Sequence, residues 1–134
     1  MSASDYLELE VLDHVLGKGT RDFPSPTTLA VALFTVMPND AGTGGTEVAN
    51  LYGYARQSAT FATASAGSSS TSADLTYGPA SGGAFGTIVG VGIYDSLTHG
   101  AGNPLIFATL AVDKTVSDGD TFVISSGNLT VNLA

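Results

Sequence analysis

The stretch 84–112 constrains the fold more than any other part of the sequence, because it reads as two apolar strands joined by a polar loop. Alternation in the first strand places Val91 and Ile93 on one face, together with other residues of the same parity. The opposite face is nearly bare and carries Gly90 and Gly92. A bare strand face usually means that another group packs very close to the backbone, so we expect a close approach here.

The return strand, residues 105–112, is apolar or small on both faces. A strand of this kind lies between two layers rather than at a wet surface. The loop 95–104, which joins the two strands, carries the Asp, Ser, Gly, Asn and Pro residues that are typical of turns. We therefore expect this hairpin to form the centre of a β-sandwich or jelly-roll-like domain.

Further short strands are expected at regular spacing around the hairpin, over residues 29–36, 54–61, 73–77, 121–124 and 129–133. The first of these is apolar on both faces, which predicts a buried strand. In the second, alternation places Ala55, Ala59 and Phe61 inward and Arg56 outward.

The segments between these strands read as loops. The serine-rich run 62–72 predicts a mobile loop, and 113–120 predicts a polar turn. Short turns allow antiparallel pairing, and about seven strands with one helix are typical of a sandwich or barrel. We expect one mainly β, antiparallel β-sandwich or jelly-roll-like domain over 1–134, with a short N-terminal α-helix in 1–19 and the strands in 29–134.

Residues 2–19 are the one good candidate for an α-helix. Ser4 is the expected N-cap, and carboxylates follow it in the first turn, where they complement the helix dipole. Apolar residues recur at helical spacing and form a stripe. They are Tyr6, Leu9, Val11, Leu12, Val15 and Leu16. Gly17 or Gly19 is expected to end the helix.

This amphipathic helix leaves two alternatives open. It docks on the sandwich of its own chain, or it mediates docking to a neighbouring subunit. In the second case the residues that we expect at the interface are Tyr6, Leu9, Leu12 and Leu16.

The charge of the chain argues against nucleic acid as a partner. The net charge is −8, and the basic residues are Lys18, Arg21, Arg56 and Lys114. Four scattered cations cannot form the positive patch that a phosphate backbone needs. Charged residues make up 12% of the chain, about half of the usual share. Such a surface suits a protein that is packed against neighbouring molecules, and it suits an extracellular β adhesin as well.

Cysteine is absent, which excludes disulfides, thiol catalysis and thiolate metal sites. This composition favours synthesis in a reducing cytoplasm. Apolar runs fall short of the ~20 residues that a membrane helix needs, and the N-terminus is acidic where a signal peptide would be basic. We therefore expect no membrane contact and no secretory segment.

The sequence shows no recognisable catalytic or cofactor site. His14 and His99 have no serine nucleophile in an elbow motif, so we expect the first on the helix surface and the second in a solvated loop. Asp118 and Asp120 flank a glycine, which is typical of a turn. Weak binding of calcium is the alternative there, although a calcium loop needs more ligands. We expect no catalytic residue, no metal and no cofactor.

Arg56 is the most informative single charge, because Glu47 lies a few residues upstream of it. One interpretation is an ion pair within the chain that fixes the preceding loop. The other is an ion pair between subunits, in which case Glu47, Tyr54 and Arg56 are interface residues.

Several motifs along the chain resemble one known family. In order, they are LELEVLDHVLG, LAVALFT, TEV, GYARQ, VGIYD, NPLIF, SDGD and GNLTVNL. With these motifs the chain resembles the small virion proteins of tailed bacteriophages that are labelled tail fibre, capsid fibre or decoration proteins. The resemblance spans most of the chain, and the run 62–72 is the part without a counterpart.

This resemblance implies a non-enzymatic structural protein of the virion that is made in the host cytoplasm. We expect it to decorate and cement the exterior of the major capsid lattice, with the major capsid protein as its partner. A homo-oligomer is expected, and a trimer is favoured. The alternative is a tail-associated fibre or receptor-binding module that contacts the host surface. A small jelly-roll enzyme is a third hypothesis, but the sequence has no histidine cluster for a metal.

Overall fold

The computed structural model describes residues 2–18 and 25–133, and every strand pair in these residues is antiparallel. The elements in chain order are β1 (Ser2–Ala3), α1 (Asp5–Leu16), β2 (Ala30–Val36), β3 (Thr46–Glu47), β4 (Gln57–Ser58), β5 (Ser68–Ser70), β6 (Leu75–Tyr77), β7 (Gly86–Tyr94), β8 (Pro104–Val116), β9 (Phe122–Ile124) and β10 (Thr130–Asn132).

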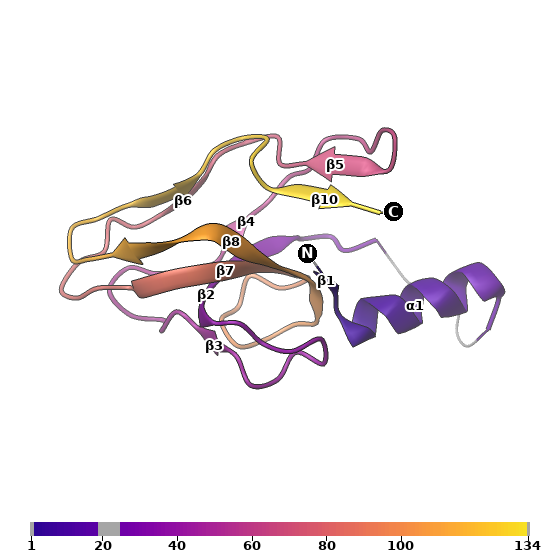
Figure 1. Ribbon diagram of the computed structural model, residues 1–134, viewed down its shortest axis with the longest axis horizontal. Coiled ribbons are helices and arrows are strands. Elements are labelled where there is room, and N and C mark those ends of the chain that lie inside the picture. The colour runs from indigo at the N-terminus through magenta and orange to yellow at the C-terminus, as the bar shows by residue number, and fades with distance from the viewer. Residues whose placement is uncertain (1, 19–24, 134) are drawn as a thin grey trace.

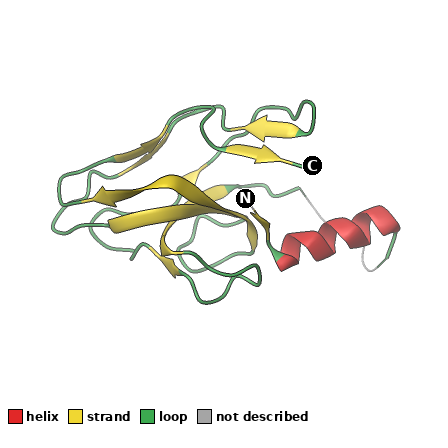
Figure 2. Ribbon diagram, in the orientation of Figure 1, coloured by secondary structure: helices red, strands yellow, loops and turns green. Residues whose placement is uncertain are grey.

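The largest sheet has the strand order β1-β8-β7-β2-β3, and β4 also pairs with β2. Two short ribbons, β6 with β9 and β5 with β10, lie along one side of this sheet (Figure 1). Long loops connect many of the strands, and α1 extends from one end of the molecule (Figure 2). The predicted fold class is therefore confirmed: the described chain is mainly β and antiparallel, with one α-helix.

The main core joins the sheet to the ribbons. Leu33 of β2 and Ile88 of β7 belong to one buried cluster with Tyr77 of β6 and Phe122 of β9. The hydroxyl of Tyr77 donates a hydrogen bond of 2.9 Å to the carbonyl oxygen of Val31, which ties β6 to the central strand. Burial of this apolar surface is the main driving force for the sandwich-like arrangement.

The central strand β2 is buried on both faces, as its apolar sequence predicts. Ala32 and Phe34 point away from the main core and form a second cluster with Tyr94 and Phe107. In this cluster the three rings contact one another, with centroids 6.1 to 6.3 Å apart. The second cluster covers the other side of the sheet at the end near the loop 95–104.

The bare face of β7 is where these rings approach the backbone. A Cβ atom at Gly92 would lie 2.9 Å from the ring of Phe34 and 3.1 Å from the ring of Phe107. At Gly90 it would lie 2.6 Å from a backbone oxygen of β8 and in contact with the sulfur of Met37. The expected close approach is confirmed, and it explains why glycine stands at both positions.

The second half of β8 differs from the expectation. Ile88 pairs with Lys114, whereas Gly90 pairs with Thr109, so residues 110–113 form a bulge opposite one residue of β7. The bulge breaks the alternation and leaves Val112 66% exposed. The prediction that 105–112 lies wholly between two layers is therefore wrong, and so is the prediction of a turn that begins at 113.

The edge of β8 beyond its first residues is open. β1 pairs with Ile106 and Phe107, and in the described part of the chain no strand pairs with β8 on that side further along. Figure 1 shows that β8 curves along β7 toward the two-stranded sheet of β6 and β9.

Two other expectations also fail. Within residues 54–61 the only strand is β4. The predicted orientation of the side chains is reversed at two positions, since Ala55 is exposed and Arg56 is buried. Arg56 can be buried because its charge is paired with Glu47 inside the protein. The run 62–72 contains β5, whose backbone pairs with β10. A serine run gives no apolar pattern, so the strand could not be recognised from sequence.

The helix α1 forms within the predicted range. It begins after Ser4, whose hydroxyl accepts a hydrogen bond of 3.2 Å from the backbone N–H of Leu7. It ends at Gly17 in the left-handed conformation, whereas Gly19, the other predicted stop, lies outside the described residues. None of its residues is buried, and it points away from the sheet (Figure 1). Tyr6 and Leu7 in its first turn pack against the main core, whereas the rest of the apolar stripe is exposed. The first alternative, docking on the sandwich of its own chain, therefore holds for the first turn alone.

We predict that Gly92→Ala destabilises the protein. The added methyl group has to displace the rings of Phe34 and Phe107, and such overpacking costs about 1–3 kcal/mol. The measurement is the free energy of unfolding in urea. The matched control is Ala111→Val, which adds methyl groups at an exposed position of β8 and should change stability by less than about 0.5 kcal/mol. Equal effects of the two substitutions would contradict this explanation of the glycine.

Candidate functional site

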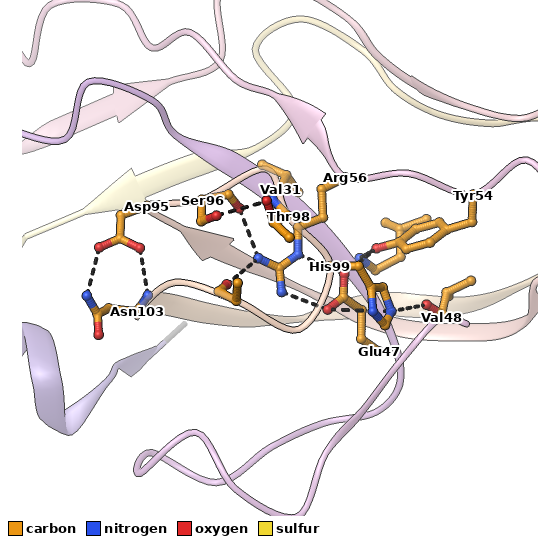
Figure 3. A network of polar contacts seen from close by, with 12 residues as sticks. Val31, Glu47, Val48, Tyr54, Arg56, Asp95, Ser96, Thr98, His99 and Asn103 are labelled. Atoms are coloured by element: carbon orange, nitrogen blue, oxygen red, sulfur yellow. Dashed lines mark hydrogen bonds and ion pairs between the residues drawn. The ribbon is translucent and has the colours of Figure 1, made fainter. Parts of the chain in front are cut away.

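The most extensive polar network in the described chain is built around Arg56 (Figure 3). Its guanidinium makes a bidentate ion pair with Glu47, from Nε to Oε1 and from Nη2 to Oε2, each 2.8 Å long. The two side chains are 1% and 9% exposed, respectively. Nη1 donates to the carbonyl oxygen atoms of Ser96 at 2.9 Å and Ala101 at 2.8 Å. Bidentate geometry makes this one of the stronger kinds of polar contact.

Three separate parts of the fold meet at this guanidinium. Glu47 lies in β3, Arg56 directly precedes β4, and the two carbonyl groups belong to the loop between β7 and β8. The guanidinium also lies 4.1 Å from the centre of the Tyr94 ring at the end of β7. A cation over an aromatic face is favourable, so the network fixes the loops at this end of the sheet.

Tyr54 and His99 complete the network on the other side of Glu47. The hydroxyl of Tyr54 donates to Oε1 of Glu47 at 2.9 Å and accepts from the backbone N–H of Leu33 at 3.0 Å. Nε2 of His99 lies 2.9 Å from the carbonyl oxygen of Val48, so this nitrogen carries the proton. His99 is therefore a partly buried member of the network and not the solvated loop residue that we expected.

Hydrogen bonds between Asp95 and Asn103 close the loop between β7 and β8. The carboxylate of Asp95 accepts hydrogen bonds from the backbone N–H of Asn103 at 2.6 Å and from its side-chain amide at 2.9 Å. Figure 3 shows this pair beside the Arg56 network. The two ends of the loop are thus joined, and its carbonyl groups are held in place for Arg56.

The electrostatics of the network favour the charged forms of both partners. Burial would raise the pKa of Glu47, but the hydrogen bonds and charge of Arg56, with the Tyr54 hydroxyl, lower it below its ordinary value of 4.5. Burial works against the charge of Arg56, yet Glu47 raises its pKa. Burial, with Glu47 nearby, raises the pKa of Tyr54 so that its hydroxyl stays protonated.

The charged groups of this arrangement bind each other. A hollow of about 290 Å³ lies beside the network, and the charged residues that line it are Glu47 and Arg56, which already bind each other. Within residues 2–18 and 25–133, no group of three His, Asp or Glu side chains could hold a metal ion. A carboxylate that already accepts hydrogen bonds from an arginine and a tyrosine is a poor metal ligand.

A larger hollow, of about 630 Å³, lies between β8 and β9. Lys114 and Asp120 are the charged residues that line it, among apolar and small side chains. Asp118 and Asp120 themselves accept backbone N–H groups, from Gly82 and Ser117 at 3.0 Å each. Their geometry is that of turn residues, which agrees with the simpler of the two sequence interpretations.

The predicted site residues fall into two separate groups. Glu47, Tyr54 and Arg56 come together, and their ion pair lies within one chain, as the first alternative proposed. The others belong to α1: Tyr6 packs against the core, whereas Leu9, Leu12 and Leu16 are exposed. The interface role of both groups stays a prediction. Sequence reasoning missed Tyr94 and Asp95 and placed His99 in solvent, because the contacts of these residues are made by chain folding and leave no pattern in sequence.

The fold and the network define a small antiparallel β protein in which a buried ion pair holds the loops together and a helix projects from the body. A family model described as "Podophage GP4 fiber I protein gp80" matches residues 2–132. The chain therefore belongs to this family of phage fibre proteins, and it is a virion component. The predicted resemblance to phage virion proteins is confirmed. A comparison with curated proteins gives no match.

The lowered pKa of Glu47 gives a prediction about pH. A carboxyl whose pKa is lower in the folded state stabilises the fold above its unfolded pKa, and this contribution is lost as the pH falls through the folded value. We predict that Glu47→Gln destabilises the protein by about 3 kcal/mol at neutral pH, because the buried Arg56 loses its counter-charge. The difference from the wild-type protein should shrink as the pH falls below 4.5.

The measurement is the free energy of unfolding from pH 7 to pH 3, with Asp113→Asn as the control, since Asp113 is exposed on β8. A difference between wild-type protein and Glu47→Gln that stays constant over this range would contradict the ionised state of Glu47.

Proposed function

We propose that this protein is a non-enzymatic structural subunit of a phage fibre. The observation that carries the proposal is the match of the fibre family over residues 2–132, which is nearly the whole chain. A fibre subunit needs a stable shape and surfaces that fit other subunits. The loops held by Arg56 support the first requirement, and the exposed helix α1 is our candidate for the second. The only buried ion pair in the described residues serves to fix loops, and this use is structural rather than chemical.

The cement function expected from sequence is the second candidate. It would place the protein on the capsid exterior, with the major capsid protein as its partner. The protein would act as a homo-oligomer, with a trimer favoured. The low charge of the chain and its exposed helix suit that role as well. The fibre description of the family favours a fibre over a capsid coat, so we make the fibre our proposal.

Location and copy number in the virion test this proposal. Particles labelled with an antibody against the protein and imaged by electron microscopy should carry the label on fibres, at a few places on each particle. Quantitative mass spectrometry of the same particles should give far fewer copies than of the major capsid protein. Label spread evenly over the head, at a copy number close to that of the capsid subunits, would favour the cement function and overturn the fibre proposal.

A further inference from the structure

We propose that the leucine stripe of α1, formed by Leu9, Leu12 and Leu16, binds an apolar groove with a basic rim on another protein of the virion. This inference rests on the proposed function, because it takes a virion protein as the partner. The described fold leaves this stripe uncovered: the three leucines are 62%, 54% and 66% exposed, and Val15, which lies next to Glu8 around the helix, is 71% exposed.

The spacing of the stripe matches helix-in-groove recognition. With 3.6 residues in each turn, Leu9, Leu12 and Leu16 fall within about 60° of one another around the helix axis. Leu7, which packs against the core, lies on the opposite side of the helix. The stripe therefore faces away from the body, and residues spaced three and four apart are the anchors by which helices occupy apolar grooves.

Carboxylates border the stripe on both sides. Glu8 and Asp13 lie about 40° outside its two edges around the helix, and Asp5 lies at its beginning. Glu10 is the fourth carboxylate of the helix, and Asp5–Leu16 contains no lysine or arginine. In the described structure none of these carboxylates takes part in an ion pair. A partner that covers the leucines would place its rim against Glu8 and Asp13, where lysine or arginine gives electrostatic complementarity.

The body presents this helix in a fixed direction. The backbone N–H of Ser4 donates to the carbonyl oxygen of Leu105 at 2.9 Å, and the backbone N–H of Asp5 donates to the carbonyl oxygen of Asp40 at 3.0 Å. The Ser4 side chain is completely buried, caps the helix and also donates to the carbonyl oxygen of Pro104. A surface that is held before binding loses less conformational freedom on binding.

The same charges argue against two other occupants. A second copy of the helix packed on the first would bring the carboxylates beside Leu9, Leu12 and Leu16 close to identical carboxylates, and such contacts are repulsive. Helices that lie on membranes carry lysine and arginine on their polar face, whereas this polar face is acidic. A groove with a basic rim fits both features of the helix, because its apolar floor can cover the leucines and its rim can contact the carboxylates beside them.

The experiment uses phage particles purified without this protein as the probe, with the full-length chain added back at increasing concentration. Leu12→Ser and Leu16→Ser should each weaken binding to the particles by about tenfold or more, because each removes a large apolar anchor. The matched control is Leu51→Ser, an exposed leucine in a loop of the body, which should bind like the wild-type protein. Circular dichroism checks that each variant keeps its fold.

Charge is tested separately. Glu8→Lys with Asp13→Lys should weaken binding by about tenfold or more, and higher salt should weaken the wild-type interaction. The control is Asp113→Lys, which makes the same change on an exposed part of β8 and should have little effect.

The outcomes separate this inference from the proposed function. If the wild-type protein binds and the helix variants bind equally well, the inference is wrong while the fibre function stands. If imaging finds the protein in virions but added protein does not bind the particles, the inference is again wrong. Self-association in analytical ultracentrifugation that disappears in Leu12→Ser would identify a second copy as the occupant and overturn the basic groove. Absence of the protein from virions would overturn the function itself.

Discussion

The buried ion pair between Arg56 and Glu47 holds together parts of the chain that are far apart in sequence. A guanidinium that is 1% exposed is tolerated only with full hydrogen bonding. Glu47 accepts hydrogen bonds from two of its nitrogen atoms, and the carbonyl groups of Ser96 and Ala101 accept from the third. The loop between β7 and β8 therefore has to take the shape that places these oxygens correctly. Tyr94 links this network to the aromatic cluster, because its ring contacts both the guanidinium of Arg56 and the other rings of the cluster.

Sequence reasoning succeeded where one local rule decides the structure. The bare face of β7 predicted close packing, Ser4 predicted the start of the helix, and the pair of Glu47 with Arg56 was one of two alternatives. It failed where backbone geometry overrides pattern. The bulge at 110–113 exposes residues that are as apolar as buried ones, and the strand β5 consists of serines. Neither is visible in side-chain chemistry, because both are made by backbone hydrogen bonds.

The body and the helix differ in whether their side chains have partners within the protein. Around Arg56 the polar groups of the body bind one another, so the loops of the body are held in one arrangement. The helix α1 keeps Leu9, Leu12 and Leu16 in solvent, while the backbone at its start is hydrogen-bonded to β8. For a member of a fibre family this division suits the proposed attachment through the helix, because the body then serves as a rigid unit.

The open edge of β8 has a consequence for how the protein behaves at high concentration. Unpaired backbone groups at a sheet edge are a template on which another strand can grow, and long flat edges lead to fibrillar aggregates. Here the bulge at 110–113 interrupts that template, and the charges of Asp113 and Lys114 lie at the interruption. An incoming strand would meet an irregular edge with two charged, solvated side chains, which disfavours pairing of this edge with another copy.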